Sequence, residues 1–191
     1  MNILLFNGEP ENVIESTSYK IIEYFKGGFS DYGSNVVIEE CDVRGIPFFD
    51  FTCEEAPEVV KEMIKKFKNA DVLIWLSPLY HGSMTGVMKN TLDWLELTSK
   101  ENAPYLTDKI VSLICWADGM HALNGINAME AVAKSLRAWI LPFSIPIARK
   151  HLFNDEGEVS NEYKMRFDLM IKLINENKIY NKQTILKTEA I

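Results

Sequence analysis

The sequence predicts an α/β fold in which a parallel β-sheet lies between two layers of helices, as a three-layer sandwich. Short apolar runs alternate five times with longer segments whose apolar residues recur at helical spacing, and this alternation is typical of parallel sheets. Several of the runs are unbroken by polar residues, as in strands that are buried on both faces. The length of 191 residues is that of one domain, so we expect a single domain over residues 1–191.

The predicted strands are the five apolar runs of the chain. They span residues 3–6, 35–40, 71–76, 110–116 and 140–148. The predicted helices are the segments that follow these runs, where apolar residues recur every three or four positions. These segments span residues 14–25, 59–67, 84–95, 126–140 and 163–174. The last segment belongs to a C-terminal helix expected at about residues 160–180, and the polar tail, residues 181–191, has no assigned element.

The composition of the strands predicts their order in the sheet. The second strand is short and ends in acidic residues, and the fifth contains Pro142 and Pro146, which cannot donate hydrogen bonds to a neighbouring strand. We therefore place these two strands at the edges, which gives a five-stranded parallel sheet in the order 2-1-3-4-5. This is the order of flavodoxin-like proteins. The alternative order 3-2-1-4-5 would put the apolar third strand at an edge.

Composition limits the partners and the compartment. The chain has 27 acidic and 20 basic residues, which gives a net charge of −7 and a pI near 5.1. Nucleic acid and anionic membranes are held by clustered Lys and Arg, so we expect neither as a partner. No apolar run approaches the ~20 residues of a membrane span, and the N-terminus shows no basic leader. The three cysteines match no redox or metal spacing, so we expect a reducing, cytoplasmic location.

Three loops are expected to meet at the carboxyl end of the sheet, where ligands bind in doubly wound folds. These loops follow the first, third and fourth strands and span residues 7–16, 77–83 and 116–121. Tyr80 and His81 in the second loop offer flat faces with polar edges, which suit a planar ring. A plainer alternative is that this loop only connects a strand to a helix, with Ser83 as the helix N-cap.

The segment around the second loop is the most specific motif in the chain. Residues 77–95 read SPLYHGSMTGVMKNTLDWL. This segment resembles the NADPH-dependent FMN reductase family, in which Pro-x-Tyr-Asn-x-Ser precedes a Gly-x-x-Lys-Asn-x-x-Asp-Trp helix, and His81 stands where the family has asparagine. Residues 41–50 and 116–142 resemble the family more weakly, and the resemblance covers about residues 1–150.

The resemblance implies a flavoprotein that uses FMN and NAD(P)H. It implies that the isoalloxazine ring is bordered by Pro78, Leu79, Tyr80, His81, Gly82 and Ser83. It places the pyrimidine edge of the ring beside Trp116, Ala117, Asp118 and Gly119. It places the FMN phosphate in the first loop and the turn after it, among Asn7, Gly8, Ser16, Thr17 and Ser18. Because the flavin supplies the chemistry, we expect no catalytic side chain and no metal.

Two loops depart from the family pattern. The first loop lacks the family's arginine and carries Glu9, Glu11 and Glu15, whose charges oppose a phosphate dianion. The third loop has Asp118 where a small residue is usual. Backbone N–H groups and hydroxyls at a helix N-terminus can still bind a phosphate, and the alternative is that Ser16 serves only as an N-cap.

Two functions therefore stay open. The first is an FMN-dependent NAD(P)H oxidoreductase, which transfers hydride from a nicotinamide to bound flavin and on to a flavin, quinone or similar small-molecule acceptor. The second is a degenerate flavodoxin-like binding or regulatory protein that does not bind FMN. The acidic first loop favours the second function, whereas the specific segment at residues 77–95 favours the first.

Two other kinds of active site are less favoured by the sequence. His81, His121 and Asp118 follow neighbouring strands and give a metal site as a minor alternative, although they have no local ligand spacing. A hydrolase is disfavoured because no GxSxG nucleophile elbow occurs near Ser83.

A second apolar face, formed by Trp94 and Leu97, lies off the main stripe of its helix. We expect this face to pack against another subunit in a homodimer or homotetramer.

Overall fold

The structure, a computed structural model, describes most of the chain. The described residues are 1–11, 16–31, 36–53 and 55–176. Residues 12–15 of the first loop, with Glu15, lie outside them, as do the last residues expected in the C-terminal helix and the whole tail at 181–191.

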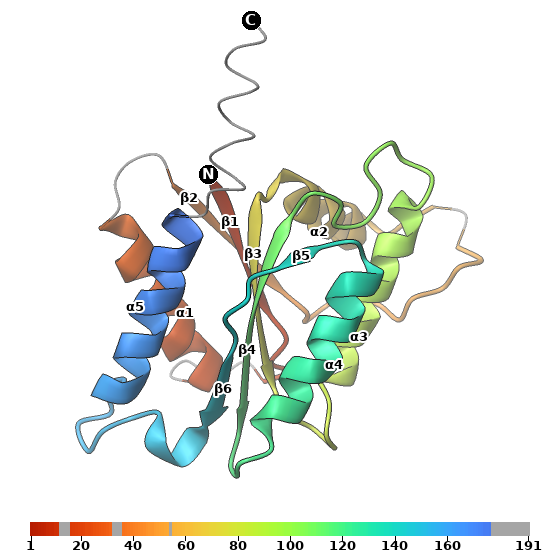
Figure 1. Cartoon of the computed structure of the whole chain (residues 1–191). Helices are drawn as coiled ribbons and strands as arrows, with labels where there is room; N and C mark the ends of the chain where they lie inside the picture. The colour runs from red at the N-terminus through yellow and green to blue at the C-terminus, as the bar shows by residue number, and fades with distance from the viewer. Residues whose placement is uncertain (12–15, 32–35, 54, 177–191) are drawn as a thin grey trace, which may run out of the picture.

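A parallel sheet forms the centre of the molecule (Figure 1). Its strands are β1 (Asn2–Asn7), β2 (Val37–Asp42), β3 (Val72–Pro78), β4 (Ile110–Ala117), β5 (Trp139–Ile140) and β6 (Ile145–Ala148). The strands pair in the order β2-β1-β3-β4-β5, every pairing is parallel, and β6 also pairs with β4. The predicted fold class and the predicted order 2-1-3-4-5 are confirmed.

The predicted fifth strand, residues 140–148, is interrupted and forms two short strands. β5 pairs with the start of β4 at Ile110 and Val111, and β6 pairs with the end of β4, from Ile114 to Ala117. Pro142 lies in the interruption and has no N–H group for a strand ladder. The expectation of one continuous fifth strand is therefore corrected to two pieces on the same edge of β4.

Helices cover both faces of the sheet (Figure 1). One face packs against α1 (Thr17–Ser30) and α5 (Asn161–Asn175), and the other against α2 (Glu58–Asn69), α3 (Gly86–Asp93) and α4 (Ala122–Ser135). Each face has its own apolar core. Phe25 meets Phe167 on the first face, and Phe67 packs edge-on against Phe6 on the second. Because both faces are covered, β3 and β4 are buried along nearly their whole length.

Trp94 belongs to the second core and not to a subunit interface. Its side chain is 1% exposed, its indole N–H donates to the carbonyl oxygen of Pro47 (2.9 Å), and its ring packs edge-on against Phe49. The helix α3 ends at Asp93 and continues as the 3₁₀ helix η1 (Trp94–Thr98). A 3₁₀ helix has three residues per turn, so the α-helical spacing assigned Trp94 to the wrong face. The predicted interface role of Trp94 is wrong, and the oligomeric state stays a prediction.

Candidate functional site

The loops after β1 and β3 are joined to each other at the carboxyl end of the sheet. The N–H of Gly8 donates to the carbonyl oxygen of Leu76 (2.7 Å), and the Thr85 hydroxyl donates to the carbonyl oxygen of Gly8 (2.7 Å). A Cβ atom at Gly8 would lie 2.6 Å from the sulfur of Met88 and 3.0 Å from the Leu76 oxygen. Gly8 is therefore required for close packing between these loops, and its own N–H is engaged within the protein.

A tight turn at the end of the second loop presents an aromatic face. Tyr80 and Ser83 exchange two backbone hydrogen bonds of 3.0 and 3.1 Å, and the two residues between them, His81 and Gly82, have φ values of +50° and +84°. Positive φ at both central residues defines a type I′ turn. Histidine is one of the residues that tolerates this conformation best, which explains how it replaces asparagine here. The side chain of Tyr80 is 47% exposed at the base of the turn.

The helix after this turn is capped by Thr85. The Thr85 hydroxyl accepts a hydrogen bond from the N–H of Met88 (3.2 Å) at the start of α3. The alternative in which Ser83 is the N-cap is wrong, because α3 begins two residues later than that cap requires. Ser83 instead closes the Tyr80 turn.

The third loop lies beside the second. The N–H of Leu79 donates to the carbonyl oxygen of the buried Trp116 (2.8 Å), which fixes the spacing of the two loops. Asp118 is largely exposed, and its carboxylate forms an ion pair of 2.6 Å with the guanidinium of Arg149. No role is predicted for Arg149 from the sequence, although Arg149 directly follows the last predicted strand and is therefore expected at the same end of the sheet.

These loops and Arg149 line a cleft of about 270 Å³. It is lined by Glu9, Glu11, Pro78, Leu79, Tyr80, Trp116, Ala117, Asp118 and Arg149. Six of these nine residues are predicted site residues from the second and third loops, namely Pro78, Leu79, Tyr80, Trp116, Ala117 and Asp118. Three carboxylates and one guanidinium share this lining, so the cavity is acidic on balance. His81, Gly82 and Gly119 lie exposed in the adjoining loops.

The predicted phosphate site at the start of α1 holds a carboxylate. The side chain of Glu9 is buried, and its Oε2 accepts hydrogen bonds from the N–H (3.1 Å) and the hydroxyl of Ser18. The hydroxyl of Ser16 accepts from the N–H of Tyr19 (3.2 Å) and is the N-cap of α1, as one alternative held. Thr17 is the first residue of the helix. The N–H of Glu9 donates to the side-chain oxygen of Asn7 (3.0 Å).

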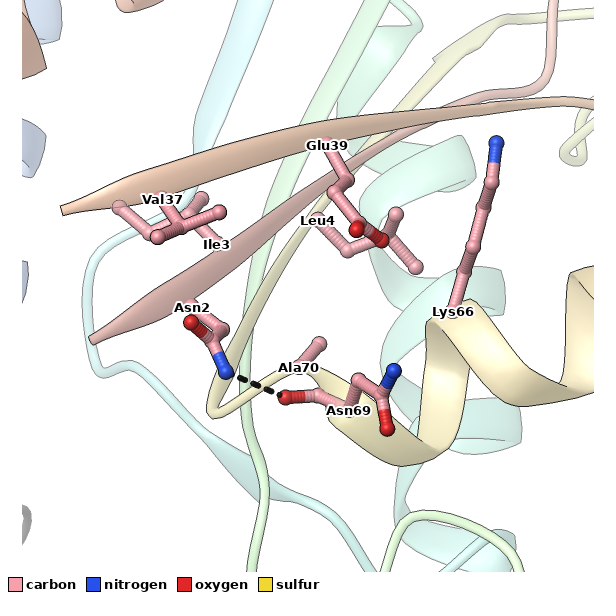
Figure 2. A pocket seen from close by; sticks show the side chains of 8 residues that line it. All are labelled: Asn2, Ile3, Leu4, Val37, Glu39, Lys66, Asn69 and Ala70. Atoms are coloured by element: carbon pink, nitrogen blue, oxygen red, sulfur yellow. Dashed lines mark hydrogen bonds between the residues drawn. The ribbon is translucent and has the colours of Figure 1, made fainter.

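A second cavity, of about 150 Å³, lies at the opposite end of the sheet (Figure 2). It is bounded by the first residues of β1 and β2 and by the end of α2, where the Asn2 carboxamide donates to the carbonyl oxygen of Asn69 (3.0 Å). Lys66 stands at its rim and donates to the carbonyl oxygen of Glu40 (2.8 Å). This cavity lies away from the carboxyl edge, where the three loops meet.

The described part of the chain lacks two kinds of feature. No helix there combines the length and the apolar composition needed to cross a membrane. Among the same residues, no three His, Cys, Asp or Glu side chains converge as metal ligands would.

The strand order and the cleft at the switch point between β1 and β3 define a flavodoxin-like α/β protein. The sequence model of one family, NADPH-dependent FMN reductase, matches residues 1–151. The chain therefore belongs to the NADPH-dependent FMN reductase family, whose members are NAD(P)H-dependent oxidoreductases.

Two similar proteins have names that describe them as a reductase or as part of one. The NADPH-dependent FMN reductase ArsH of Acidithiobacillus ferrooxidans is 30% identical over 133 residues, which is 68% of this chain and 55% of ArsH. This chain thus spans about half the length of that relative. The NADH:(hydroxy)cinnamate reductase subunit CrdA of Vibrio ruber is 25% identical over 205 residues, which is 99% of this chain and 95% of CrdA.

Solved structures show the same fold. The flavoenzyme FerB of Paracoccus denitrificans, an NAD(P)H:acceptor oxidoreductase, superposes with a TM-score of 0.71 at 15% identity, covering 90% of this chain and 93% of FerB.

The family binds FMN, and the two ends of the cleft differ in how well they suit it. The exposed Tyr80 face and the turn that carries it suit the isoalloxazine ring. The other end does not suit the phosphate, because Glu9 already occupies the donors of Ser18.

Proposed function

We propose that this chain is a flavin-dependent NAD(P)H oxidoreductase, which transfers hydride from a nicotinamide to a bound flavin and on to a flavin, quinone or similar small-molecule acceptor. The observation that carries this proposal is the type I′ turn of residues 80–83, which holds an exposed tyrosine beside the loop at residues 116–118. When bound, a flavin supplies the two-electron chemistry, and the protein supplies stacking, orientation and charge.

The chain holds its ring-binding surface rigidly. Two backbone hydrogen bonds close the turn between Tyr80 and Ser83, and a third, from Leu79 to Trp116, ties the turn to the neighbouring loop. Gly125 of α4 packs so closely under this region that a Cβ atom there would lie 3.1 Å from the side chain of Leu79. A planar ligand thus meets a surface that is already formed, so little ordering is required on binding.

Charge at the far side of the cleft is balanced by an ion pair. Asp118 alone would oppose a flavin, which becomes anionic on reduction. The guanidinium of Arg149 lies 2.6 Å from the Asp118 carboxylate and lines the same cavity. Arg149 therefore offsets the charge of Asp118 where a reduced flavin would need a cation, although solvent screens a pair this exposed.

A second function, that of a binding or regulatory subunit without flavin, is favoured by one specific observation. Glu9 accepts from the N–H and the hydroxyl of Ser18, which are two donors at the start of α1 that a phosphate could use. The similarity to CrdA, whose name is that of a reductase subunit, extends along nearly the whole chain and supports the subunit part of this alternative.

One experiment separates the two functions. The purified chain is mixed with FMN and with NADH or NADPH in the absence of oxygen, and the visible absorbance of oxidised flavin is followed. The reductase proposal predicts bleaching that depends on the protein, is slowed in Tyr80→Ala and is unchanged in Trp139→Ala, an exposed aromatic of β5 at the opposite edge. Bleaching at the same rate with and without protein, for both nicotinamides, would favour the subunit instead.

A further inference from the structure

The N-terminus of α1 has an anionic partner from its own chain. Glu9 is 9% exposed, and a single carboxylate oxygen, Oε2, accepts from both the backbone N–H and the hydroxyl of Ser18. Ser18 is itself buried, at 2% exposed, and lies in the first turn of the helix. An N–H in the first turn together with a nearby hydroxyl is the donor set with which helix N-termini bind phosphate. In this chain the N–H and the hydroxyl of Ser18 already donate to Glu9.

Hydrogen bonds of Glu9 and of the residue before it hold the Glu9 backbone in place. The N–H of Glu9 donates to Asn7, and the preceding residue, Gly8, is bound through its N–H to Leu76 and through its carbonyl oxygen to Thr85. The carboxylate is thus an intramolecular ligand at high effective concentration, with which a free anion has to compete.

A phosphate group entering this position would meet two costs. It would have to displace Glu9 from a buried, hydrogen-bonded position, and a buried charge without partners is strongly unfavourable. It would also approach the negative charges of Glu9 and Glu11, which both line the cleft. Neither cost applies to a ligand that lacks a phosphate.

We infer that Glu9 is a built-in substitute for the phosphate of FMN, so that the cleft binds a flavin through its ring alone and accepts riboflavin as readily as FMN. This inference rests on the proposed function for the identity of the ring. It deepens that function by naming the substrate class, an exchangeable flavin with or without a phosphate, in place of a tightly held FMN.

The test compares two flavins on three proteins. FMN and riboflavin are titrated with the wild-type chain, Glu9→Ala and Glu11→Ala, and quenching of flavin fluorescence gives each dissociation constant. Glu11→Ala is the matched control, because Glu11 is an exposed carboxylate that lines the same cleft. It removes the same charge and leaves the bond between Glu9 and Ser18 intact.

The inference predicts equal affinities of the wild-type chain for the two flavins, within about threefold. Glu9→Ala frees the donors of Ser18, so it should bind FMN about tenfold tighter or more, with riboflavin nearly unchanged, since one or two charged hydrogen bonds are worth about that factor. A wild-type preference for FMN of about tenfold would overturn the inference. An equal gain in Glu11→Ala would also overturn it, because general charge repulsion would then explain the effect.

A flavin-free measurement keeps this inference separable from the proposed function. Thermal unfolding is recorded in inorganic phosphate and in sodium chloride of equal ionic strength. Phosphate should raise the melting temperature of Glu9→Ala by about 3 °C or more and leave the wild-type value unchanged. If neither flavin binds but this difference is seen, the proposed function fails together with the ring-only binding that rests on it, and the role of Glu9 as the occupant of an anion site stands. The same response in both proteins overturns the inference. If Glu9→Ala does not fold, Glu9→Gln replaces it, because a neutral amide oxygen is a weaker acceptor for Ser18 that phosphate can displace without stranding a buried charge, and a smaller rise is then expected.

Discussion

The hydroxyl of Thr85 donates a 2.7 Å hydrogen bond to the carbonyl oxygen of Gly8, and this bond joins the loop after β1 to the start of α3. The same hydroxyl accepts from the N–H of Met88 and caps that helix. One buried side chain thus positions two of the three loops that form the cleft.

Replacing Thr85 by valine keeps the shape and removes both hydrogen bonds. The variant Thr85→Val leaves a buried carbonyl and a helix N–H without this partner, so the free energy of unfolding should fall by about 2–3 kcal/mol. Chemical denaturation measures the change. Thr91→Val is the control, because the Thr91 hydroxyl bonds only to the Val87 carbonyl, which keeps its helical partner, and it should cost less than about 1 kcal/mol.

Packing at Gly8 leaves no room for a side chain. Gly8→Ala would put a Cβ atom 2.6 Å from Met88 and 3.0 Å from a backbone oxygen, so we expect a loss of stability of about 1–3 kcal/mol. Gly27→Ala is the contrast, because Gly27 lies inside α1 with no atom within 4 Å of the added carbon. That variant should be stabilised by about 0.5–1 kcal/mol. Similar melting temperatures for the two variants would contradict the packing described.

The cysteines should differ sharply in reactivity. Burial raises the pKa of the Cys41 and Cys115 thiols to about 12, whereas Cys53 is exposed. At about pH 8 the two buried thiols hold almost no thiolate, so a thiol reagent should modify Cys53 alone in the folded chain and all three residues after denaturation. Mass spectrometry of the labelled protein counts the sites.

The same raised pKa values set a dependence of stability on pH. Above about pH 8.5 the unfolded chain releases the protons of Cys41 and Cys115, while the folded chain keeps them. The unfolded state then binds fewer protons, so the contribution of these thiols to stability should decline as the pH rises from there. A variant with both cysteines replaced by alanine should lose this part of the pH dependence.

Arg149 should act by balancing the charge of Asp118. Arg149→Gln leaves the carboxylate without its counter-ion and should weaken flavin binding by about two- to fivefold, with unfolding free energy unchanged within about 0.5 kcal/mol, because the pair is exposed. The double variant Arg149→Gln/Asp118→Asn removes both charges and should bind flavin nearly as the wild-type chain does. A double variant as weak as Arg149→Gln would mean that Arg149 contacts the ligand directly.

Most of the fold was predictable because the composition of each strand reflects its position in the sheet. The unbroken apolar runs of β3 and β4 marked them as central, and the two prolines near the C-terminus marked an edge. The break between β5 and β6 was not predicted, because a proline tolerated at an edge and a proline that interrupts a strand look alike in sequence. Trp94 was assigned to the wrong face because its periodicity was judged as α-helical, whereas the chain tightens there into η1.

The sequence was sufficient to predict which loops form the site, but not which side chains pair with each other there. Topology alone placed the loops after β1, β3 and β4 together. The charges of Glu9 and Asp118 were visible in the sequence, but their partners, Ser18 and Arg149, are set by tertiary contacts. From the sequence, Glu9 is therefore expected only to repel a phosphate, whereas in the structure it is a buried hydrogen-bond acceptor.

The central claim is that the wild-type chain binds an isoalloxazine ring at the Tyr80 turn, and flavin fluorescence tests it directly. Flavin fluorescence is recorded as the protein is added to FMN and, separately, to riboflavin, and Tyr80→Ala is measured in parallel. We expect quenching of both flavins that saturates at one flavin per chain and is weakened in Tyr80→Ala. Full fluorescence of both flavins in excess wild-type protein would contradict it.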